Sequence, residues 1–199
     1  MLFIGLTGGI GSGKSEALAA CRRAGAAVLS SDAVVHDLLG TDEVMDTLVA
    51  RWGEAVLSGG DIDRAAVAEI VFKNPDELRW LEQTLFPLVG AEMAAWRVEL
   101  EASDPPPRAA VVEVPLLFEA GIEGAFDATI AIVADEEIRV ERAGGRDHRA
   151  VGERTARQLS QDDKAARADF VIRNDGSIED LERAIAGLLD RLAREGARS

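Results

Sequence analysis

A glycine-rich segment near the start of the sequence limits the possible folds more than any other feature. It reads Gly-Gly-Ile-Gly-Ser-Gly-Lys-Ser over residues 8–15, and the apolar segment 2–7 directly before it is short enough to be one buried strand. Glycines let the backbone approach phosphates closely, and a helix that begins near Gly13 would point its unpaired N–H groups at them. The segment therefore predicts a phosphate-binding loop between a strand and a helix, rather than a simple glycine-rich turn.

The residue types in this loop favour a nucleoside triphosphate. Lys14 would reach the β- and γ-phosphates, and the Ser15 hydroxyl would bind Mg²⁺. The helix formers that follow stop at Gly25, which suits the end of a helix. The predicted nucleotide-binding residues of the loop are Gly8, Gly9, Ile10, Gly11, Ser12, Gly13, Lys14 and Ser15.

The length and composition of the chain favour one α/β domain with an inserted helical region. Of its 199 residues, 47% are hydrophobic, which is enough to fill such a core. A formal net charge of −14 argues against a nucleic-acid partner, whose phosphates require a basic surface. Because the sequence has no leader pattern and no apolar run of about 20 residues, we expect a cytoplasmic protein with no membrane partner. Cys21, the only cysteine, is expected to be a buried thiol.

Four further apolar segments resemble buried strands, and they cover residues 26–30, 109–114, 128–133 and 170–172. Helical patterns separate these segments, and a final helix is predicted over 178–193. Strands that alternate with helices indicate a parallel sheet with helices on both faces. We therefore predict a three-layer α/β fold with a five-stranded parallel sheet.

The longest stretch between two of these strands has a helical pattern. Residues 41–103 show helical periodicity that no strand pattern interrupts, and Pro87 should kink one of the helices or begin a new one. The proline run at 104–107 then forms a rigid linker. We expect a single domain over 1–199 that contains an inserted helical region at 35–103.

Two carboxylates lie near the ends of predicted strands. Asp32 comes two residues after the second strand, and Glu113 lies at the end of the third. Ligands of doubly wound folds bind at the carboxyl ends of strands, so Asp32 could act on a substrate, although it could equally cap the next helix. Glu113 could hold the water shell of Mg²⁺ or be a surface carboxylate. His36 and His148 have no ligand set at metal-binding spacing, and we expect no metal site there.

Basic residues are concentrated in the segment 139–157. Arg142 and Arg146 are four residues apart, which places them on one face of a helix. Such a run could be a solvated helix face, but the glycine pair within it suits a bent lid whose arginines clamp the transferred phosphoryl group. We therefore predict an arginine-rich helical lid over 139–160.

Taken together, these segments resemble the dephospho-coenzyme A kinase family, and the resemblance covers most of the chain. The matching positions are 6–15, Asp32, 62–64, 81–82, 114–119, Arg142, Arg146, Gln158 and 168–174. The loop alone indicates only a nucleoside triphosphate, whereas Val-Pro-Leu-Leu-Phe-Glu over 114–119 and Ala-Asp-Phe-Val-Ile-Arg-Asn over 168–174 are far more selective. Ser30, Phe86 and Glu113 depart from the family pattern, in which Asp, His and Asp are usual.

The resemblance implies a P-loop kinase fold and transfer of the ATP γ-phosphoryl group to the ribose 3′-hydroxyl of dephospho-coenzyme A, the last step of coenzyme A biosynthesis. It also implies that the helical region 35–103 contributes to the acceptor site and that Asn174 lies near adenine. Lys14, Mg²⁺ and the lid arginines would offset charge on the phosphoryl oxygens. Asp32 would orient the 3′-hydroxyl and accept its proton.

Two other classes of protein share part of this pattern. Another P-loop small-molecule kinase, acting on a nucleoside monophosphate or on shikimate, would share the loop and the lid but lack the signature at 114–119. A nucleotide-binding protein without kinase activity would lack Asp32 and the basic lid. No oligomeric state is predicted.

Overall fold

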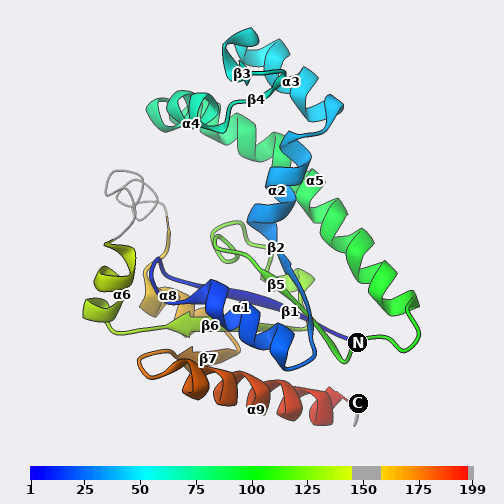
Figure 1. Cartoon of the computed structure of the whole chain (residues 1–199), viewed down its shortest axis with the longest axis vertical. Helices are drawn as coiled ribbons and strands as arrows, with labels where there is room; N and C mark the ends of the chain where they lie inside the picture. The colour runs from blue at the N-terminus through cyan, green and yellow to red at the C-terminus, as the bar shows by residue number, and fades with distance from the viewer. Residues whose placement is uncertain (145–157, 197–199) are drawn as a thin grey trace. The chain divides into compact units, whose positions relative to one another are not determined.

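A computed structural model of the chain describes residues 1–144 and 158–196 (Figure 1). Its main sheet has five strands in the order β2-β5-β1-β6-β7, and every neighbouring pair is parallel. The strands are β1 (Leu2–Gly8), β2 (Ala27–Ser30), β5 (Ala109–Glu113), β6 (Ala128–Val133) and β7 (Phe170–Arg173). They coincide with the five predicted segments, so the predicted parallel sheet is confirmed.

Helices account for most of the remaining described chain. They are α1 (Lys14–Arg23), α2 (Ser31–Leu39), α3 (Asp42–Trp52), α4 (Arg64–Lys73), α5 (Pro75–Ala102), α6 (Glu136–Ala143), α8 (Gln161–Arg167) and α9 (Ile178–Gly196), with short 3₁₀ turns η1 (Glu54–Val56) and η2 (Glu123–Ala125). Within the described residues, no helix combines the length and the apolar composition needed to cross a membrane.

The chain divides into two compact units. The first unit consists of Met1–Ser30 and Arg97–Ser199, and the second of Ser31–Trp96. The first unit therefore contains the whole parallel sheet, and the second contains α2, α3, α4 and most of α5.

The sheet of the first unit is covered on both faces, because apolar side chains occupy consecutive positions of its strands. On one face, Ile4 joins Cys21 of α1 and Ile185 of α9 in the main core. On the other face, Gly5 lies so close to the chain after β5 that an added Cβ would be 2.5 Å from Leu117 Cδ1. Together the sheet and its two coverings give the three layers that were predicted.

Cys21 is fully buried in this core, as the sequence predicted. Burial raises the pKa of its thiol to about 12. The thiol therefore stays protonated near neutral pH, and it packs as a small apolar side chain.

A short antiparallel hairpin interrupts the helices of the second unit. It consists of β3 (Leu57–Ser58) and β4 (Asp61–Ile62). Gly59 and Gly60 between them have φ values of 66° and 98°, and positive φ at both positions is what a tight two-residue hairpin turn needs. The expectation that no strand interrupts this region was wrong, because strands of two residues are too short to show alternation in the sequence.

α5 continues through Pro87 as one helix of 28 residues. Of the two alternatives predicted at Pro87, a new helix is excluded, and a kink stays a prediction. A proline removes one backbone N–H, whereas the other turns of a long helix keep their hydrogen bonds. The flanking side chains of Leu85 and Val89 are buried, which stabilises the turns on both sides of the proline.

A cluster of polar and aromatic side chains joins α3 to α5. Arg51 donates two hydrogen bonds of 2.9 Å to the carboxylate of Glu77, and Trp52 Nε1 donates a third of 2.8 Å. These donors, Arg51 first, hold the pKa of Glu77 below its usual range. The ring of Trp52 also meets the ring of Trp80 edge-on, with 5.2 Å between centroids. The two helices are thus held together by several contacts within the second unit.

Candidate active site

The predicted phosphate-binding loop connects β1 to α1 in the first unit. Gly11 and Gly13 have φ values of 77° and 90°, a region that favours glycine. An added Cβ would lie 2.4 Å from the carbonyl oxygen of Arg139 at Gly11, and 2.2 Å from Asn174 Nδ2 at Gly13. Both the backbone conformation and the close neighbours therefore require glycine at these two positions.

The N-terminus of α1 is open toward a ligand. Gly13 is its N-cap residue, and within the described part of the chain there is no side-chain hydrogen bond that caps this end of the helix. The first N–H groups of the helix consequently keep their capacity to bind an anion. The hydroxyl of Ser12 is buried and has no hydrogen-bond partner among the described residues. Lys14 extends back over the loop, where Nζ donates to the carbonyl oxygen of Gly9 at 3.1 Å.

Two side chains from other elements contact the loop directly, and a third contacts one of these two residues. Asn174 is 6% exposed, and its Nδ2 donates to the carbonyl oxygen of Ser12 at 2.9 Å. Arg139 Nε donates to the carbonyl oxygen of Ile10 at 3.1 Å, and Arg142 Nη1 donates to the carbonyl oxygen of Asn174 at 3.0 Å. α6 is therefore attached to the loop through Arg139 and to the end of β7 through Arg142. Arg142 does not stand on a purely solvated helix face.

Glu113 lies at the carboxyl end of β5, where it is 8% exposed. Its strand position pairs with Leu6 of β1, two residues before the loop, and with Ser30 of β2. The alternative of a surface carboxylate is thereby wrong. The sequence could not show this burial, because it arises from strands on both sides of β5.

Asp32 belongs to the second unit, in which it is an exposed residue in the first turn of α2. Because α2 already begins at Ser31, Asp32 stands inside the helix and is not its cap residue. Its carboxylate has no ion pair or hydrogen bond among the residues that the structure describes.

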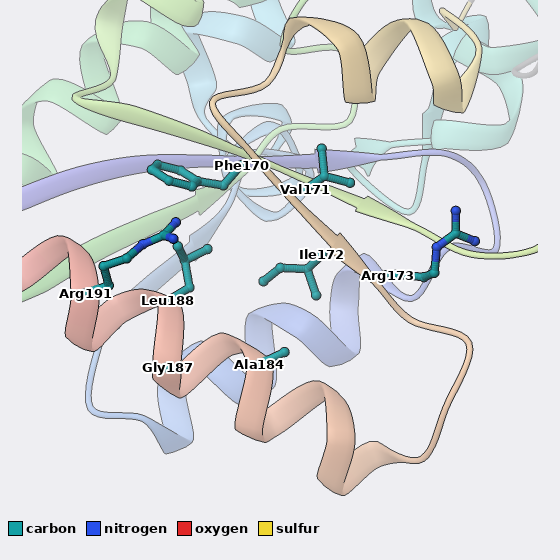
Figure 2. A pocket seen from close by; sticks show the side chains of 8 residues that line it. All are labelled: Phe170, Val171, Ile172, Arg173, Ala184, Gly187, Leu188 and Arg191. Atoms are coloured by element: carbon teal, nitrogen blue, oxygen red, sulfur yellow. The ribbon is translucent and has the colours of Figure 1, made fainter.

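A cavity between β7 and α9 lies outside the phosphate-binding loop and its surroundings. This cavity of about 350 Å³ is lined by residues of β7 and α9, among them Phe170, Ile172 and Leu188 (Figure 2). Ile172 points toward α9 and Val171 points away from it, as expected for successive residues of a strand. The guanidinium of Arg191 lies 4.8 Å from the centre of the Phe170 ring. No predicted site residue lines this cavity, so the candidate site remains the loop and its surroundings.

Comparison with known proteins decides the family. Residues 2–180 match the dephospho-CoA kinase family. The chain belongs to this family. The predicted resemblance is confirmed.

Individual relatives agree with the family match. A dephospho-CoA kinase of Protochlamydia amoebophila is 35% identical over 193 residues, which are 95% of each chain. One of Thermus thermophilus is 38% identical over 194 residues, which are 96% of this chain and 92% of the relative. A crystal structure from Thermus thermophilus, also 38% identical, superposes with a TM-score of 0.81 over 96% of this chain and 97% of that one.

The two segments that are most selective for the family hold strand ends together. Asp169 Oδ2 accepts hydrogen bonds from the N–H and the hydroxyl of Thr129 at 2.8 and 2.7 Å, which joins the start of β6 to the chain before β7. Lys164 is fully buried, and its Nζ donates to Pro115 O at 2.5 Å and to Glu119 Oε1 at 2.8 Å. These segments thus stabilise the frame behind the loop.

The described structure brings together some of the site residues that were predicted from the sequence. Arg142 and Asn174 are in contact beside the loop. Arg146 and His148 lie outside the described residues. Most of the predicted lid over 139–160 also lies outside them. Sequence reasoning missed Arg139 as a separate contact of the loop and missed Lys164 altogether. Arg139 precedes Arg142 by three residues on α6, a spacing that could have indicated a shared face. No local signal marks Lys164.

Proposed function

We propose that this chain is an ATP-dependent dephospho-CoA kinase, which transfers the γ-phosphoryl group of ATP to the ribose 3′-hydroxyl of dephospho-CoA and releases coenzyme A and ADP. The observation that carries the proposal is a phosphate-binding loop, open at the N-terminus of α1, in a chain of the dephospho-CoA kinase family. The alternative of a nucleoside monophosphate or shikimate kinase is not favoured, because the family match runs through the signature at 114–119.

In this proposal the loop binds the phosphates of ATP. The residues assigned to ATP are Gly8, Gly9, Ile10, Gly11, Ser12, Gly13, Lys14, Ser15 and Asn174. The buried Ser12 hydroxyl that lacks a partner and the uncapped helix N-terminus support this assignment, since both leave donors for an anion. Asn174 supports the loop through Ser12. Its proximity to adenine stays a prediction.

A Mg²⁺ ion is part of the proposed site, and two oxygen donors fit it. Ser15 is exposed in the first turn of α1 and offers its hydroxyl. Glu113 is the last residue of β5, the strand next to β1, and offers its carboxylate. Mg²⁺ takes hard oxygen ligands and usually few of them from protein, the rest being phosphate and water. Within the described residues no group of three or more His, Cys, Asp or Glu could hold a metal ion, which agrees with such sparse coordination. When bound, Mg²⁺ would neutralise charge on the phosphate oxygens.

Asp32 is proposed as the general base. The ribose 3′-oxygen forms a bond to the γ-phosphorus, the bond from the γ-phosphorus to the bridging oxygen of ADP breaks, and the hydroxyl proton moves to the Asp32 carboxylate. The carboxylate is exposed and pairs with no cation of residues 1–144 and 158–196, which supports this role because its oxygens keep their capacity to accept a proton.

Two regions complete the proposal. The helical region 35–103 is assigned to the acceptor, and the segment 139–160, with Arg142 and Arg146, to a lid whose arginines offset the charge of the transferred group. The contact of Arg142 with Asn174 supports a place for this arginine beside the nucleotide. The location of the enzyme in the cytoplasm stays a prediction.

The reaction itself is tested by measuring ADP release with and without dephospho-CoA. We expect release to depend on this acceptor, and the product to carry a new phosphate at the ribose 3′ position by mass spectrometry and phosphorus NMR. Shikimate serves as the control acceptor, and we expect it to give less than about a hundredth of the rate, because it lacks the adenosine diphosphate part of dephospho-CoA that the site would bind. Equal release without any acceptor would indicate a nucleotide hydrolase instead.

The lid assignment predicts a difference between two arginines. Arg142→Lys keeps the charge but loses the planar fork, and we expect kcat to fall about tenfold, the loss typical of one hydrogen bond to a charged group. Arg183→Lys on α9 is the matched control, since Arg183 is an exposed arginine that forms an ion pair with Asp180, and its kcat should stay within twofold. Steady-state kinetics measures kcat for both variants, and an Arg142→Lys enzyme with unchanged kcat would show that this arginine does not act on the transferred phosphoryl group.

A further inference from the structure

The second unit is strongly acidic, and its few basic residues differ in their partners. Residues 31–96 contain four lysines and arginines against thirteen aspartates and glutamates. Three of the four basic side chains form ion pairs: Arg51 with Glu77, Lys73 with Glu69 and Arg79 with Asp76. The fourth, Arg64, has no carboxylate within ion-pair distance among the described residues. It is therefore the one cation of this unit whose charge no carboxylate of the described chain neutralises.

The conformation at Arg64 is fixed by its neighbours. Arg64 is the first residue of α4, and Asp63 caps this helix by accepting hydrogen bonds from the N–H groups of Ala65 and Ala66 at 2.9 and 3.2 Å. The side chain of Arg64 approaches α2, where its Nη1 lies 3.1 Å from Nδ1 of His36. A guanidinium only donates hydrogen bonds, so Nδ1 of His36 is the acceptor in this contact. His36 consequently orients the guanidinium and leaves its charge intact.

This histidine lies close to the proposed base. Asp32 and His36 are four residues apart in α2, so they share one helix face with roughly 5–6 Å between their Cβ atoms. The guanidinium of Arg64 thus stands about one helical turn along α2 from Asp32. In dephospho-CoA, the 3′-hydroxyl and the 5′-diphosphate are carried by the same ribose, only a few bonds apart. When the acceptor presents its 3′-hydroxyl to Asp32, its diphosphate lies at a distance from Asp32 that is similar to the distance between Asp32 and the guanidinium of Arg64.

We propose that Arg64 binds the 5′-diphosphate of the acceptor and that His36 positions it for this contact. The inference rests on the proposed function, from which it takes the acceptor and the role of Asp32. A diphosphate approaching an acidic unit is repelled unless a local cation compensates, and Arg64 is the cation available. The planar fork of a guanidinium also matches two phosphate oxygens at once.

The proposal is tested first by acceptor kinetics. Arg64→Gln should raise the KM for dephospho-CoA by roughly tenfold to a hundredfold, the loss typical of hydrogen bonds to a charged group, while the KM for ATP and kcat at saturating acceptor change little. Arg79→Gln is the matched control, because Arg79 is also exposed but forms an ion pair with Asp76, and its KM values should stay within twofold. An unchanged acceptor KM in Arg64→Gln, or a fall in kcat alone, would overturn the proposal.

A second measurement separates the diphosphate from the rest of the acceptor. Adenosine carries the same ribose and base without any phosphate, and it serves as a competitive inhibitor against dephospho-CoA at saturating ATP. Its inhibition constant should be the same in the wild type and in Arg64→Gln. An equal weakening of adenosine and dephospho-CoA would mean that Arg64 shapes the pocket instead of binding phosphate. If the protein did not phosphorylate dephospho-CoA at all, the proposed function would fail, and calorimetric binding of dephospho-CoA to both proteins would still decide the role of Arg64.

The role of His36 is tested by a pair of variants. His36→Leu removes the acceptor of the hydrogen bond from Arg64, and we expect the KM for dephospho-CoA to rise several-fold, a smaller effect than the loss of Arg64 itself. His36→Asn retains an acceptor oxygen near the position of Nδ1, and it should restore most of the affinity. Equal KM values in the two variants would show that the hydrogen bond does not position Arg64.

Discussion

Asp32→Asn is expected to lower kcat by roughly 10²–10⁴, the usual contribution of a general base. Asparagine has nearly the same shape as aspartate, but it cannot accept the proton of the 3′-hydroxyl. Ser30, two residues before Asp32, is a serine and cannot take over the role of the base. The KM for ATP should change little, because Asp32 is assigned to the acceptor.

The same substitution should have a small effect on stability. Asp32 lies in the first turn of α2, where a negative charge stabilises a helix by about 0.3–1 kcal/mol. Buried Val34 and Leu38 anchor the helix independently of this charge. The melting temperature should therefore fall by only a few degrees. Asp37→Asn, at another exposed carboxylate of α2, is the control and should keep kcat within twofold. An Asp32→Asn enzyme within about threefold of the wild type would show that the proton leaves without a side-chain base.

Lys14→Ala is expected to lower kcat by at least ~10²–10³, the usual cost of removing one preorganised donor to a developing charge. Lys14 follows Gly13 at the start of α1, and its ammonium already reaches back to Gly9 O across the loop. Alanine removes this cation without disturbing the helix, because alanine is the best helix former. The KM for ATP should rise as well, since the lysine also contacts the bound nucleotide in the proposal.

Arg22→Ala is the control for the lysine variant, because it removes an exposed cation from the last turn of the same helix. Its turnover should match that of the wild type within twofold. Melting curves of both variants establish that the fold survives. A Lys14→Ala enzyme that retains more than about a tenth of wild-type turnover would exclude the proposed contact with the transferred phosphoryl group.

The parts of the fold that were predictable depend on local patterns. The strands of the sheet are continuous apolar runs, and the loop is a motif of adjacent residues, so both were visible in the sequence. The hairpin at 57–62 and the unbroken helix through Pro87 were not, because two-residue strands have no periodicity and a long helix tolerates one lost hydrogen bond. Tertiary packing decided both cases.

In the candidate site, too, some features follow from local sequence patterns and others depend on tertiary packing. The residues of the loop, Asp32 and Glu113 follow from motif and strand position, whereas the contacts around them join residues far apart in the chain. Asn174 is 162 residues from Ser12, whose carbonyl oxygen it holds, and Lys164 is 49 residues from Pro115. Such pairs depend on how the strands are ordered in the sheet, and a single sequence does not specify that order.

The positions of the tryptophans have a practical consequence for spectroscopy. The chain has three tryptophans, Trp52, Trp80 and Trp96, and all of them fall in the second unit. Intrinsic fluorescence therefore reports on the helical unit, while far-ultraviolet circular dichroism reports on the backbone of both units. Comparing the two signals during heating measures whether the units melt together, since coincident transitions are a test of cooperative unfolding. The chain thus carries a built-in optical probe for one of its two units.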